Sequence, residues 1–353
     1  MRVIAVESSP RPDGQSATRL LLDAVLDGLR EGGADAAVVR LRTAKINACT
    51  GCFSCWTATP GRCIHRDQMT EEFLPAWLAA DVAIYASPLY HYGVTATMKT
   101  FIERTLPALE PFFELRDGRT VHPVRSRAPA AVVLSAAGFP ERDVFAELSS
   151  WARRVFGSRL VGEIYRPGAE VLLSGGAGLD AALSGARDAG RELAASGRIS
   201  AETSERIAAV QLEGEAFRAV GNLMWKTCIA EGVTPREMQL RRIVPRPDSI
   251  AGFLQLLAVG FNPAAAGDTR AVIQFDFSGE CPGSCHVRIE DGRLETALGP
   301  AASSDARIEA PFENWIDVVT RKANPQIAFM TGKCRATGQV GILLRLPKFF
   351  ERP

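Results

Sequence analysis

Short apolar runs alternate with longer amphipathic segments over roughly the first two hundred residues. Residues 2–6 and 36–41 are apolar runs, and between them residues 20–29 carry apolar side chains at helical spacing. This order predicts a strand, a loop, a helix and a second strand. The same alternation predicts helices at 73–80, 95–106, 144–156 and 179–195, and strands at 81–86, 130–136 and 159–165. Strands that alternate with helices indicate an α/β domain with a doubly wound parallel sheet covered on both faces.

The pattern changes near residue 198. Residues 200–242 are typical of helix and charged connector, and Pro245 and Pro247 mark a boundary. Beyond it, residues 270–277 alternate between apolar and polar positions. Two further strand-like runs, 286–289 and 293–298, flank a turn at Asp291–Gly292. We therefore expect three parts, an α/β domain at 1–198, a helical connector at 199–247 and an α+β domain at 248–353.

Composition narrows the class of protein. The chain has 353 residues, of which 46% are hydrophobic and 23% charged, with a net charge of +1. These values are typical of globular domains and favour neither nucleic acid nor an anionic membrane as the main partner. The apolar run at the N-terminus ends at Glu7, too early for a signal peptide, and the run at 250–261 is too short to span a bilayer. We expect a cytoplasmic protein without a transmembrane segment.

The loop after the first strand is a candidate phosphate site. It contains neither G-x-G-x-x-G nor a P-loop, which disfavours a dinucleotide fold. It offers hydroxyl, amide and guanidinium groups just ahead of a helix, at Ser8, Ser9, Arg11, Gln15, Ser16 and Thr18. Such donors at a helix N-terminus can hold a monophosphate such as that of FMN. They can equally cap the helix and form a turn, and the loop alone leaves both interpretations open.

Two later loops contain further candidate residues for a flavin site. Residues 87–93 follow the strand that ends at Ala86, and residues 137–140 follow the next strand. Together with residues 8–16 and 98–104, they resemble the NADPH-dependent FMN reductase and iron–sulfur flavoprotein group, whose fold is flavodoxin-like. The resemblance implies an FMN-dependent oxidoreductase. It assigns the phosphate to Ser9, Arg11, Gln15 and Ser16, one side of the isoalloxazine to Pro88, Leu89, Tyr90 and Gly93, and its other edge to Ala137 and Gly138.

Two cations follow the loop at residues 87–93. Lys99 and Arg104 lie on the expected helix at 95–106. They are expected to form structural ion pairs rather than to contact the flavin.

Four of the eight cysteines are crowded into residues 49–63. Cys49, Cys52, Cys55 and Cys63 have the spacing C-x2-C-x2-C-x7-C, which suits three corners of a cubane cluster and a fourth ligand better than it suits zinc. In iron–sulfur flavoproteins a compact motif in this place binds a [4Fe-4S] cluster, so the resemblance implies these four ligands. Many flavodoxin-like relatives carry a similar motif without an assigned cluster. The thiols are then packing groups or redox-active groups. The following Asp67-Gln68-Met69 departs slightly from the family, which often has two acidic residues before this methionine.

The C-terminal part resembles the sterol carrier protein 2 (SCP2) family. The resemblance rests on residues 271–279, 291–294, 324–333 and 338–346. It implies a small α+β fold around an apolar tunnel that binds a lipid, a fatty acyl chain or another hydrophobic ligand. The expected lining, in which each residue can also be plain core, is Phe253, Leu256, Leu257, Phe312, Trp315, Ile316, Phe329 and Met330.

These observations lead to two functional hypotheses for the chain and to a third for its C-terminal domain, that it serves only as an oligomerisation or solubility element. In the first, NAD(P)H reduces FMN, and FMN reduces a hydrophobic acceptor such as a quinone or an activated alkene, held or delivered by the SCP2-like domain. No acid–base pair stands out, so no catalytic residue is assigned. In the second, the chain is a non-enzymatic electron carrier or redox sensor with a lipid-binding module. The resemblance also implies a homo-oligomer, a dimer or tetramer, in which the flavin site borrows residues from a neighbour.

Overall fold

The computed structural model describes residues 1–116, 118–169, 177–210 and 214–350. The chain divides into two compact units, Met1–Leu212 and Glu213–Pro353, which are treated separately below. The boundaries expected after residues 198 and 247 remain predictions. Within the described ranges, no helix combines the length and apolar character needed to cross a bilayer.

A parallel sheet forms the centre of the first unit. Among the described residues it has five strands in the order β2-β1-β3-β6-β7, and each neighbouring pair is parallel. The three middle strands are buried on both faces, which explains why they read as continuous apolar runs. The predicted doubly wound α/β architecture is confirmed. The strands are β1 (Arg2–Glu7), β2 (Asp35–Arg40), β3 (Val82–Pro88), β6 (Ala130–Ala136) and β7 (Leu160–Arg166).

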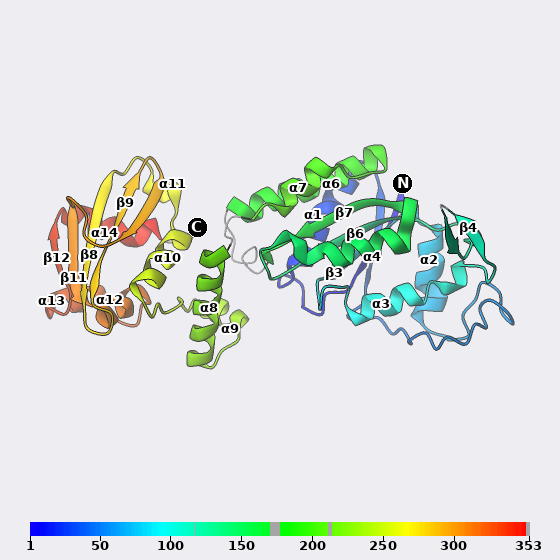
Figure 1. The fold of residues 1–353 in the computed structure, drawn as a ribbon, viewed down its shortest axis with the longest axis horizontal. Coiled ribbons are helices and arrows are strands. Elements are labelled where there is room, and N and C mark those ends of the chain that lie inside the picture. Colours follow the sequence, from blue (N-terminus) through cyan, green and yellow to red (C-terminus); the bar gives the residue numbers. More distant parts are fainter. Residues whose placement is uncertain (117, 170–176, 211–213, 351–353) are drawn as a thin grey trace. The chain divides into compact units, whose positions relative to one another are not determined.

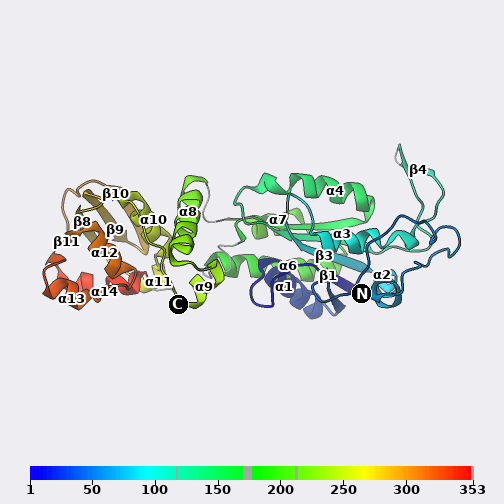
Figure 2. The ribbon, with the colours of Figure 1, turned by 90° about the horizontal axis from the view of Figure 1, so that it is seen from below.

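Helices cover both faces of this sheet. One face packs against α1 (Ala17–Glu31) and α6 (Ala177–Ser196). The other packs against α2 (Leu74–Ala79), α3 (Ala96–Glu103) and α4 (Ala146–Phe156). Figure 2 shows α4 on one side of the strands and α1 on the other. Each face therefore has its own apolar core.

Helices α1 and α6 approach each other closely because glycines meet at their contact. A Cβ atom at Gly28 would lie 1.9 Å from the carbonyl oxygen of Arg187, and one at Gly190 would lie 2.1 Å from that of Val25. Neither backbone atom can move without displacing its helix. The two glycines therefore set the distance between the helices.

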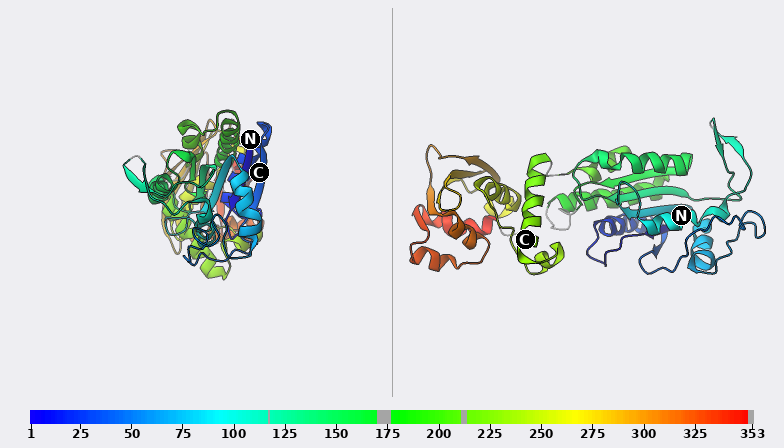
Figure 3. Two further views of the ribbon diagram at one scale, coloured as in Figure 1. Left: turned by 90° about the vertical axis from the view of Figure 1, so that its right-hand side faces the viewer. Right: turned by 60° about the horizontal axis from the view of Figure 1, so that its bottom comes forward.

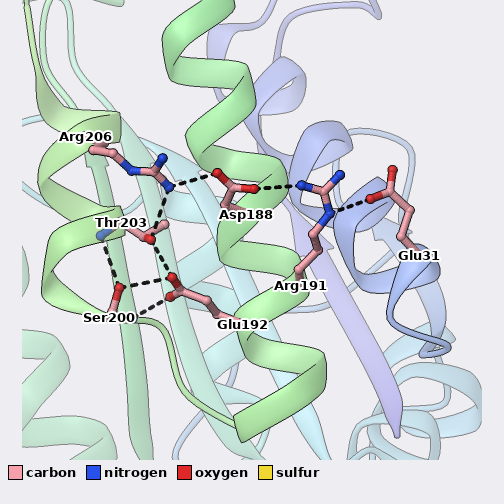
Figure 4. Close-up of polar contacts among 7 residues, drawn as sticks. All are labelled: Glu31, Asp188, Arg191, Glu192, Ser200, Thr203 and Arg206. Carbon is pink, nitrogen blue, oxygen red and sulfur yellow. Dashed lines mark hydrogen bonds and ion pairs between the residues drawn. The ribbon is translucent and has the colours of Figure 1, made fainter.

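A polar network joins α6 to α1 and to α7 (Ala201–Ala208), as Figure 4 shows. Arg191 pairs with Glu31 at 2.7 Å and with Asp188 at 2.7 Å, and Arg206 pairs with Asp188 at 2.9 Å. Glu192 accepts a hydrogen bond from the backbone N–H of residue 200 at 2.8 Å. Exposed pairs of this kind each contribute little. Their positions nevertheless show that α7 packs as part of the first unit.

The first unit also carries a hairpin that the sequence analysis did not predict. Strands β4 (Glu114–Arg116) and β5 (Arg119–Val121) are antiparallel. Figure 2 shows β4 in an arm that extends away from the sheet, and the two views in Figure 3 show the same arm from other directions. Phe112, Phe113 and Leu115 are exposed there. Such short strands without a buried face leave no periodic signal in the sequence.

The second unit is built on a mixed sheet with the order β10-β9-β8-β11-β12 (Figure 1). Only the pair β8 and β11 is parallel. Asp291 and Gly292 have φ values of 49° and 69° in the turn between β9 and β10, so the predicted hairpin turn is confirmed. The strands are β8 (Ala271–Ser278), β9 (Gly283–Glu290), β10 (Arg293–Leu298), β11 (Ala306–Pro311) and β12 (Arg335–Gly338).

Helices pack against one face of this second sheet; some precede its strands in the chain, and others lie between or after its last two strands. The predicted α+β pattern is confirmed. The helices are α8 (Gly214–Glu231), α9 (Pro235–Leu240), α10 (Ile250–Gly260), α11 (Pro263–Ala266), α12 (Phe312–Val319), α13 (Pro325–Met330) and α14 (Val340–Phe349). Of the side chains expected to line an apolar site, Phe253, Leu257, Phe312, Trp315 and Ile316 are buried, and Leu256 and Phe329 are partly buried. Met330 is 87% exposed, so its expected place in a lining is wrong.

The glycine contact gives a testable prediction. Gly190→Ala should lower the free energy of unfolding by about 3 kcal/mol or more, because the new methyl group meets backbone atoms that cannot yield. Urea unfolding followed by circular dichroism measures this. Gly221→Ala is the matched control, since its helical position is open, and it should be neutral or stabilising by up to about 1 kcal/mol. Equal effects of the two substitutions would contradict the role of Gly190.

Candidate functional site

The loops after β1, β3 and β6 meet at one edge of the parallel sheet. All three strands run the same way, so their carboxyl ends lie together, and chain order reverses between β1 and β3. Ligands of open α/β sheets bind at such a switch point. Backbone hydrogen bonds tie the start of two of these loops to the neighbouring strand, from Ser8 N–H to the Ala86 oxygen of β3 at 3.0 Å and from Leu89 N–H to the Ala136 oxygen of β6 at 2.9 Å. The three predicted loops are therefore parts of one site.

The first loop is ordered by its own polar groups. The Ser9 Oγ accepts a hydrogen bond from the backbone N–H of Arg11 at 3.3 Å, and the Arg11 Nη1 donates to the Gln15 backbone oxygen at 3.5 Å. Ser16 is the N-cap of α1, and its Oγ accepts from the Arg19 N–H at 3.1 Å. The capping interpretation of Ser16 is thus correct. A hydroxyl that accepts one bond still carries a hydrogen to donate, so capping does not compete with a phosphate role.

A carboxyl group that the sequence analysis did not single out lies beneath this loop. Glu7, the last residue of β1, is buried and accepts the Ser9 backbone N–H at 2.8 Å. Burial raises the pKa of Glu7, and the Ser9 hydrogen bond and the charges of Arg19 and Arg40 only partly offset this. In the sequence, the feature that could have identified Glu7 was a charged residue at the end of an otherwise apolar strand.

The second loop is a strained two-residue turn. The backbones of Tyr90 and Gly93 exchange hydrogen bonds of 3.0 Å, and the two residues between them, His91 and Tyr92, have φ values of 48° and 62°. Such turns favour Asn-Gly, because glycine has no Cβ atom and the short polar side chain of asparagine tolerates positive φ better than most side chains do. The turn leaves Tyr90 and Tyr92 about half exposed at the edge of the sheet. Pro88 and Leu89 are partly buried at its base.

Thr95, which the sequence analysis also missed, ties the first two loops together. It is the N-cap of α3, and its Oγ1 accepts from the Met98 N–H. The same hydroxyl donates to the Ser8 Oγ at 2.8 Å, and the Thr95 N–H donates to the Ser87 Oγ at 3.0 Å. A threonine before a helix was the available signal, but only the fold brings it to Ser8.

The third loop continues from β6 along the same edge. Ala137 is buried, and its N–H donates to the Arg166 backbone oxygen at 2.9 Å. Gly138 and Phe139 follow it and are exposed. The predicted residues of this loop therefore lie beside those of the loop after β3.

The four clustered cysteines line one pocket after β2. Ile64, Leu106 and Pro107 supply part of its remaining wall, and all four thiols are free. Burial raises the pKa of Cys55, and the charges of Cys63, Cys49 and Cys52 raise it further, so the thiols are close enough to interact. Hydrogen bonds from Ser54 and Thr50 lower the pKa of the exposed Cys52.

The donor set of this pocket is rich in thiols. Four thiols at one pocket are ligands of a type that both zinc and iron–sulfur clusters take. Among the described residues, however, no three Cys, His, Asp or Glu side chains are placed to hold a metal ion. The pocket therefore offers the donor type of a metal centre without an assembled ligand set.

An ion pair that is almost fully buried holds the cysteine loop in place. Arg104 donates through Nη1 and Nη2 to both carboxylate oxygens of Asp67, at 2.8 and 3.0 Å, and their side chains are 1% and 5% exposed. The same guanidinium donates to the Asn47 backbone oxygen at 2.6 Å and to the Thr70 hydroxyl at 3.0 Å. The expected structural ion pair of Arg104 is thus present. Lys99 instead pairs with Glu103 on the surface.

Charge and hydrogen bonding fix the protonation states of this pair. Burial disfavours the charged form of Asp67, but hydrogen bonds from Arg104, Asn47 and Thr70, with the charge of Arg104, outweigh it and hold the pKa of Asp67 well below its usual range. Burial likewise opposes the charge on Arg104, yet Asp67 and the Cys63 thiol raise its pKa. A permanent positive charge therefore lies against the cysteine pocket.

Backbone strain in the first unit is confined to these loops. Among its described residues, the non-glycine positions with positive φ are Phe53 in the cysteine loop and His91 and Tyr92 in the loop after β3. Each such residue costs about 1–2 kcal/mol. Strain of this kind gathers at functional sites, where the surrounding structure maintains it.

Two family models match separate parts of the chain. The NADPH-dependent FMN reductase model matches residues 1–148, and the SCP-2 sterol transfer family model matches residues 255–351. Both resemblances expected from the sequence are confirmed.

Curated relatives match shorter stretches. An iron-sulfur flavoprotein of Archaeoglobus fulgidus is 40% identical over 107 residues, which are 30% of this chain and 46% of that protein. An FMN-dependent NADH:quinone oxidoreductase of Thiobacillus denitrificans is 30% identical over 123 residues, 33% of this chain and 60% of that one. Hydroxysteroid dehydrogenase-like protein 2 of Xenopus tropicalis is 31% identical over 88 residues, 25% of this chain and 21% of that one. The chain spans about half the length of the iron-sulfur flavoproteins that it matches.

The buried ion pair predicts a pH-dependent loss of stability. Asp67→Asn should lower the free energy of unfolding at pH 7 by about 3 kcal/mol, because Arg104 then stays buried without its counter-charge. The folded-state pKa of Asp67 is depressed, so the wild-type advantage is complete above the unfolded value of about 3.9 and is lost as the pH falls below it.

Urea unfolding of wild type and variant between pH 7 and pH 3 measures this difference. Asp23→Asn, which breaks the more exposed pair with Arg19, is the control and should change stability by less than about 0.5 kcal/mol. If the difference in the free energy of unfolding between wild type and Asp67→Asn stays constant down to pH 3, the depressed pKa of Asp67 is contradicted.

Proposed function

We propose that this chain is an FMN-dependent NAD(P)H oxidoreductase with a [4Fe-4S] cluster, which reduces a hydrophobic acceptor held or delivered by its SCP2-like unit. The observation that carries the proposal is the meeting of the loops after β1, β3 and β6 at the switch point of the first sheet. The match of residues 1–148 to the NADPH-dependent FMN reductase model supports the same cofactor. The cytoplasm, which keeps thiols reduced, is the proposed location.

The first loop supplies donors for the phosphate of FMN. Ser9, Arg11, Gln15 and Ser16 lie together directly before α1. The N-terminus of that helix adds a partial positive charge and unpaired N–H groups, which favour an anion. Because Ser16 caps the helix, its hydroxyl is held at the place where the phosphate would bind.

The next two loops supply a surface for the isoalloxazine ring. Pro88, Leu89 and Tyr90 precede the strained turn, and Ala137 and Gly138 lie on the neighbouring strand's loop. A bound FMN would supply two-electron chemistry at the surface that these residues form, with hydride uptake from NAD(P)H and reduction of an acceptor such as a quinone, with two protons, to a quinol. The half-exposed Tyr90 and Tyr92 fit a site that a second copy of the chain covers.

No close packing among the described residues explains why position 93 is a glycine, Gly93. A Cβ atom there would meet only the Tyr90 backbone oxygen, at 3.9 Å, and Gly93 does not have a positive φ. The protein fold therefore tolerates alanine at this position. The space that glycine leaves next to the turn is available to a flat ring.

The cluster is proposed for the pocket lined by Cys49, Cys52, Cys55 and Cys63. The name of the Archaeoglobus relative supports it. The cysteine loop follows β2, whose neighbour β1 leads into the proposed phosphate loop. Both groups would then lie at the same edge of one sheet, as single-electron exchange between them requires.

The second unit is proposed to hold a hydrophobic small molecule or lipid. Its match to the SCP-2 sterol transfer family and its apolar core of aromatic side chains support this. The acceptor of the electrons, a quinone or an activated alkene, belongs to the same chemical class. The alternative function is a non-enzymatic electron carrier or redox sensor with a lipid-binding module. The two differ in steady-state oxidation of NADPH with a quinone, which only the enzyme sustains.

Gly93→Ala tests the flavin site. The wild type should be isolated with a flavin spectrum or should bind added FMN, and the variant should bind FMN about tenfold more weakly, a loss of about 1.4 kcal/mol. Fluorescence titration of flavin-free protein gives both affinities. Gly341→Ala, at an open helical position in the second unit, should leave the affinity unchanged. Colourless protein that does not bind FMN would sink the proposed function.

Cys52→Ser tests the cluster. Because Cys52 is exposed, the substitution should leave the fold and the bound FMN intact while iron and acid-labile sulfide are lost. Metal and sulfide analysis with anaerobic absorbance spectra measures both cofactors. Cys281→Ser in the second unit should retain both. Wild-type protein with four reactive thiols and no iron would instead support the redox-thiol interpretation of the cysteines.

A further inference from the structure

The cysteine pocket contains two buried side-chain nitrogen atoms that have no hydrogen-bond partner among the described residues. They are the Nε of Arg104 and the Nε2 of His65, and both residues line the pocket beside the four thiols. An unpaired buried donor costs about 1–3 kcal/mol, and native proteins contain few of them. Two such atoms at one pocket therefore indicate that a bound group with acceptor atoms belongs there.

The Arg104 donor is held rigidly. Nη1 and Nη2 are fixed by Asp67, by the Asn47 backbone oxygen and by the Thr70 hydroxyl. Because the guanidinium group is planar, these bonds also fix the direction of the remaining N–H, at Nε. Asp67, Asn47 and Thr70 take the place of water around Nη1 and Nη2. The remaining N–H of the guanidinium group, at Nε, has none of these partners and lies at the pocket.

The His65 donor comes from the cysteine loop itself. His65 follows Cys63 by two residues, so the loop that presents the thiol also positions the imidazole. The neighbouring wall of Ile64, Leu106 and Pro107 offers apolar carbon at the pocket. The Thr50 hydroxyl and the Glu103 carboxylate also line the pocket, but neither makes a hydrogen bond to Nε2, which leaves a bound group to supply its partner.

We propose that the Nε–H of Arg104 and the Nε2–H of His65 donate hydrogen bonds to sulfur atoms of the iron–sulfur cluster and thereby raise its reduction potential. The inference rests on the proposed function, because it requires the cluster. Donors near the sulfurs stabilise the more negative, reduced form of a cluster, and hydrogen bonding is one of the known determinants of its potential. Both residues would act on the cluster through these hydrogen bonds.

His65 is the better residue to test, because Arg104 also maintains the fold. His65→Leu removes the donor, whereas His65→Gln places an amide N–H at about the same distance from the backbone. In protein as isolated, His65→Leu should keep its iron and sulfide but lower the ratio of reduced to oxidised cluster about tenfold at a fixed potential. This corresponds to about 59 mV for one electron. His65→Gln should recover most of the shift.

An anaerobic redox titration followed by electron paramagnetic resonance measures the midpoint potential. His122→Leu is the matched control, because His122 packs on Trp56 at 4.6 Å in the same region but does not line the pocket. Its potential should equal that of the wild type. Arg104→Lys, which keeps the charge opposite Asp67 and removes Nε, provides a second and independent variant that should shift the potential in the same direction.

The outcomes separate this inference from the proposed function. Wild-type protein that binds FMN but contains no iron and sulfide overturns this inference and the proposed cluster, and leaves the proposed flavin site standing. A wild-type cluster whose potential is the same in His65→Leu and Arg104→Lys overturns the inference alone, and a buried water would then be the partner of the two donors. A shift in His65→Leu that His65→Gln does not reduce also overturns it, because loss of packing rather than of a donor would then be the cause.

Discussion

The buried pair of Asp67 and Arg104 is the contact on which the cysteine loop depends. The two residues are 37 positions apart, and between them they join the end of α3, the turn before α2 and the start of the cysteine loop. A buried pair of this kind is weak evidence for stability in general, because desolvation offsets its attraction. Here the pair also holds the backbone of Asn47, whose N–H donates to Asp67 at 2.8 Å and whose carbonyl oxygen accepts from Arg104 at 2.6 Å. It specifies the position of a loop that has little regular structure of its own.

The same physical solution recurs along the edge of the sheet. The cysteine loop is held by one guanidinium group, and the loops after β1 and β3 are held by a chain of hydroxyl groups from Ser8 through Thr95 to Ser87. In each case a polar side chain from a distant segment replaces the hydrogen bonds that a helix or strand would have provided. Loops fixed in this way can present reactive groups with the precision of the scaffold beneath them.

Helices and strands that depend on local periodicity were predicted from the sequence, whereas side-chain contacts between distant segments were missed. The strand at residues 130–136 was predicted with its observed bounds, because burial on both faces makes it uniformly apolar. The helix expected from residue 73 begins instead as a π-helical turn at Met69–Phe73, where Thr70 turns toward Arg104. The ion pair of Arg104 was expected, but neither its partner nor the unpaired His65 carries a signal in the sequence. Met330 looked like lining because it is apolar, yet it is exposed.

The positions of the non-glycine residues with positive φ show which loops have a conformation that folding stability alone does not explain. A turn of two residues at positive φ is made most easily by Asn-Gly, yet this chain places His91 and Tyr92 there and Phe53 in the cysteine loop. Each could be replaced by a residue that relieves about 1–2 kcal/mol, so stability alone does not account for them. Strain that persists in loops that would hold FMN and the cluster, and at no other described position of the first unit, indicates selection for what those side chains contact. That is the physical reason to look for both cofactors at one edge of this sheet.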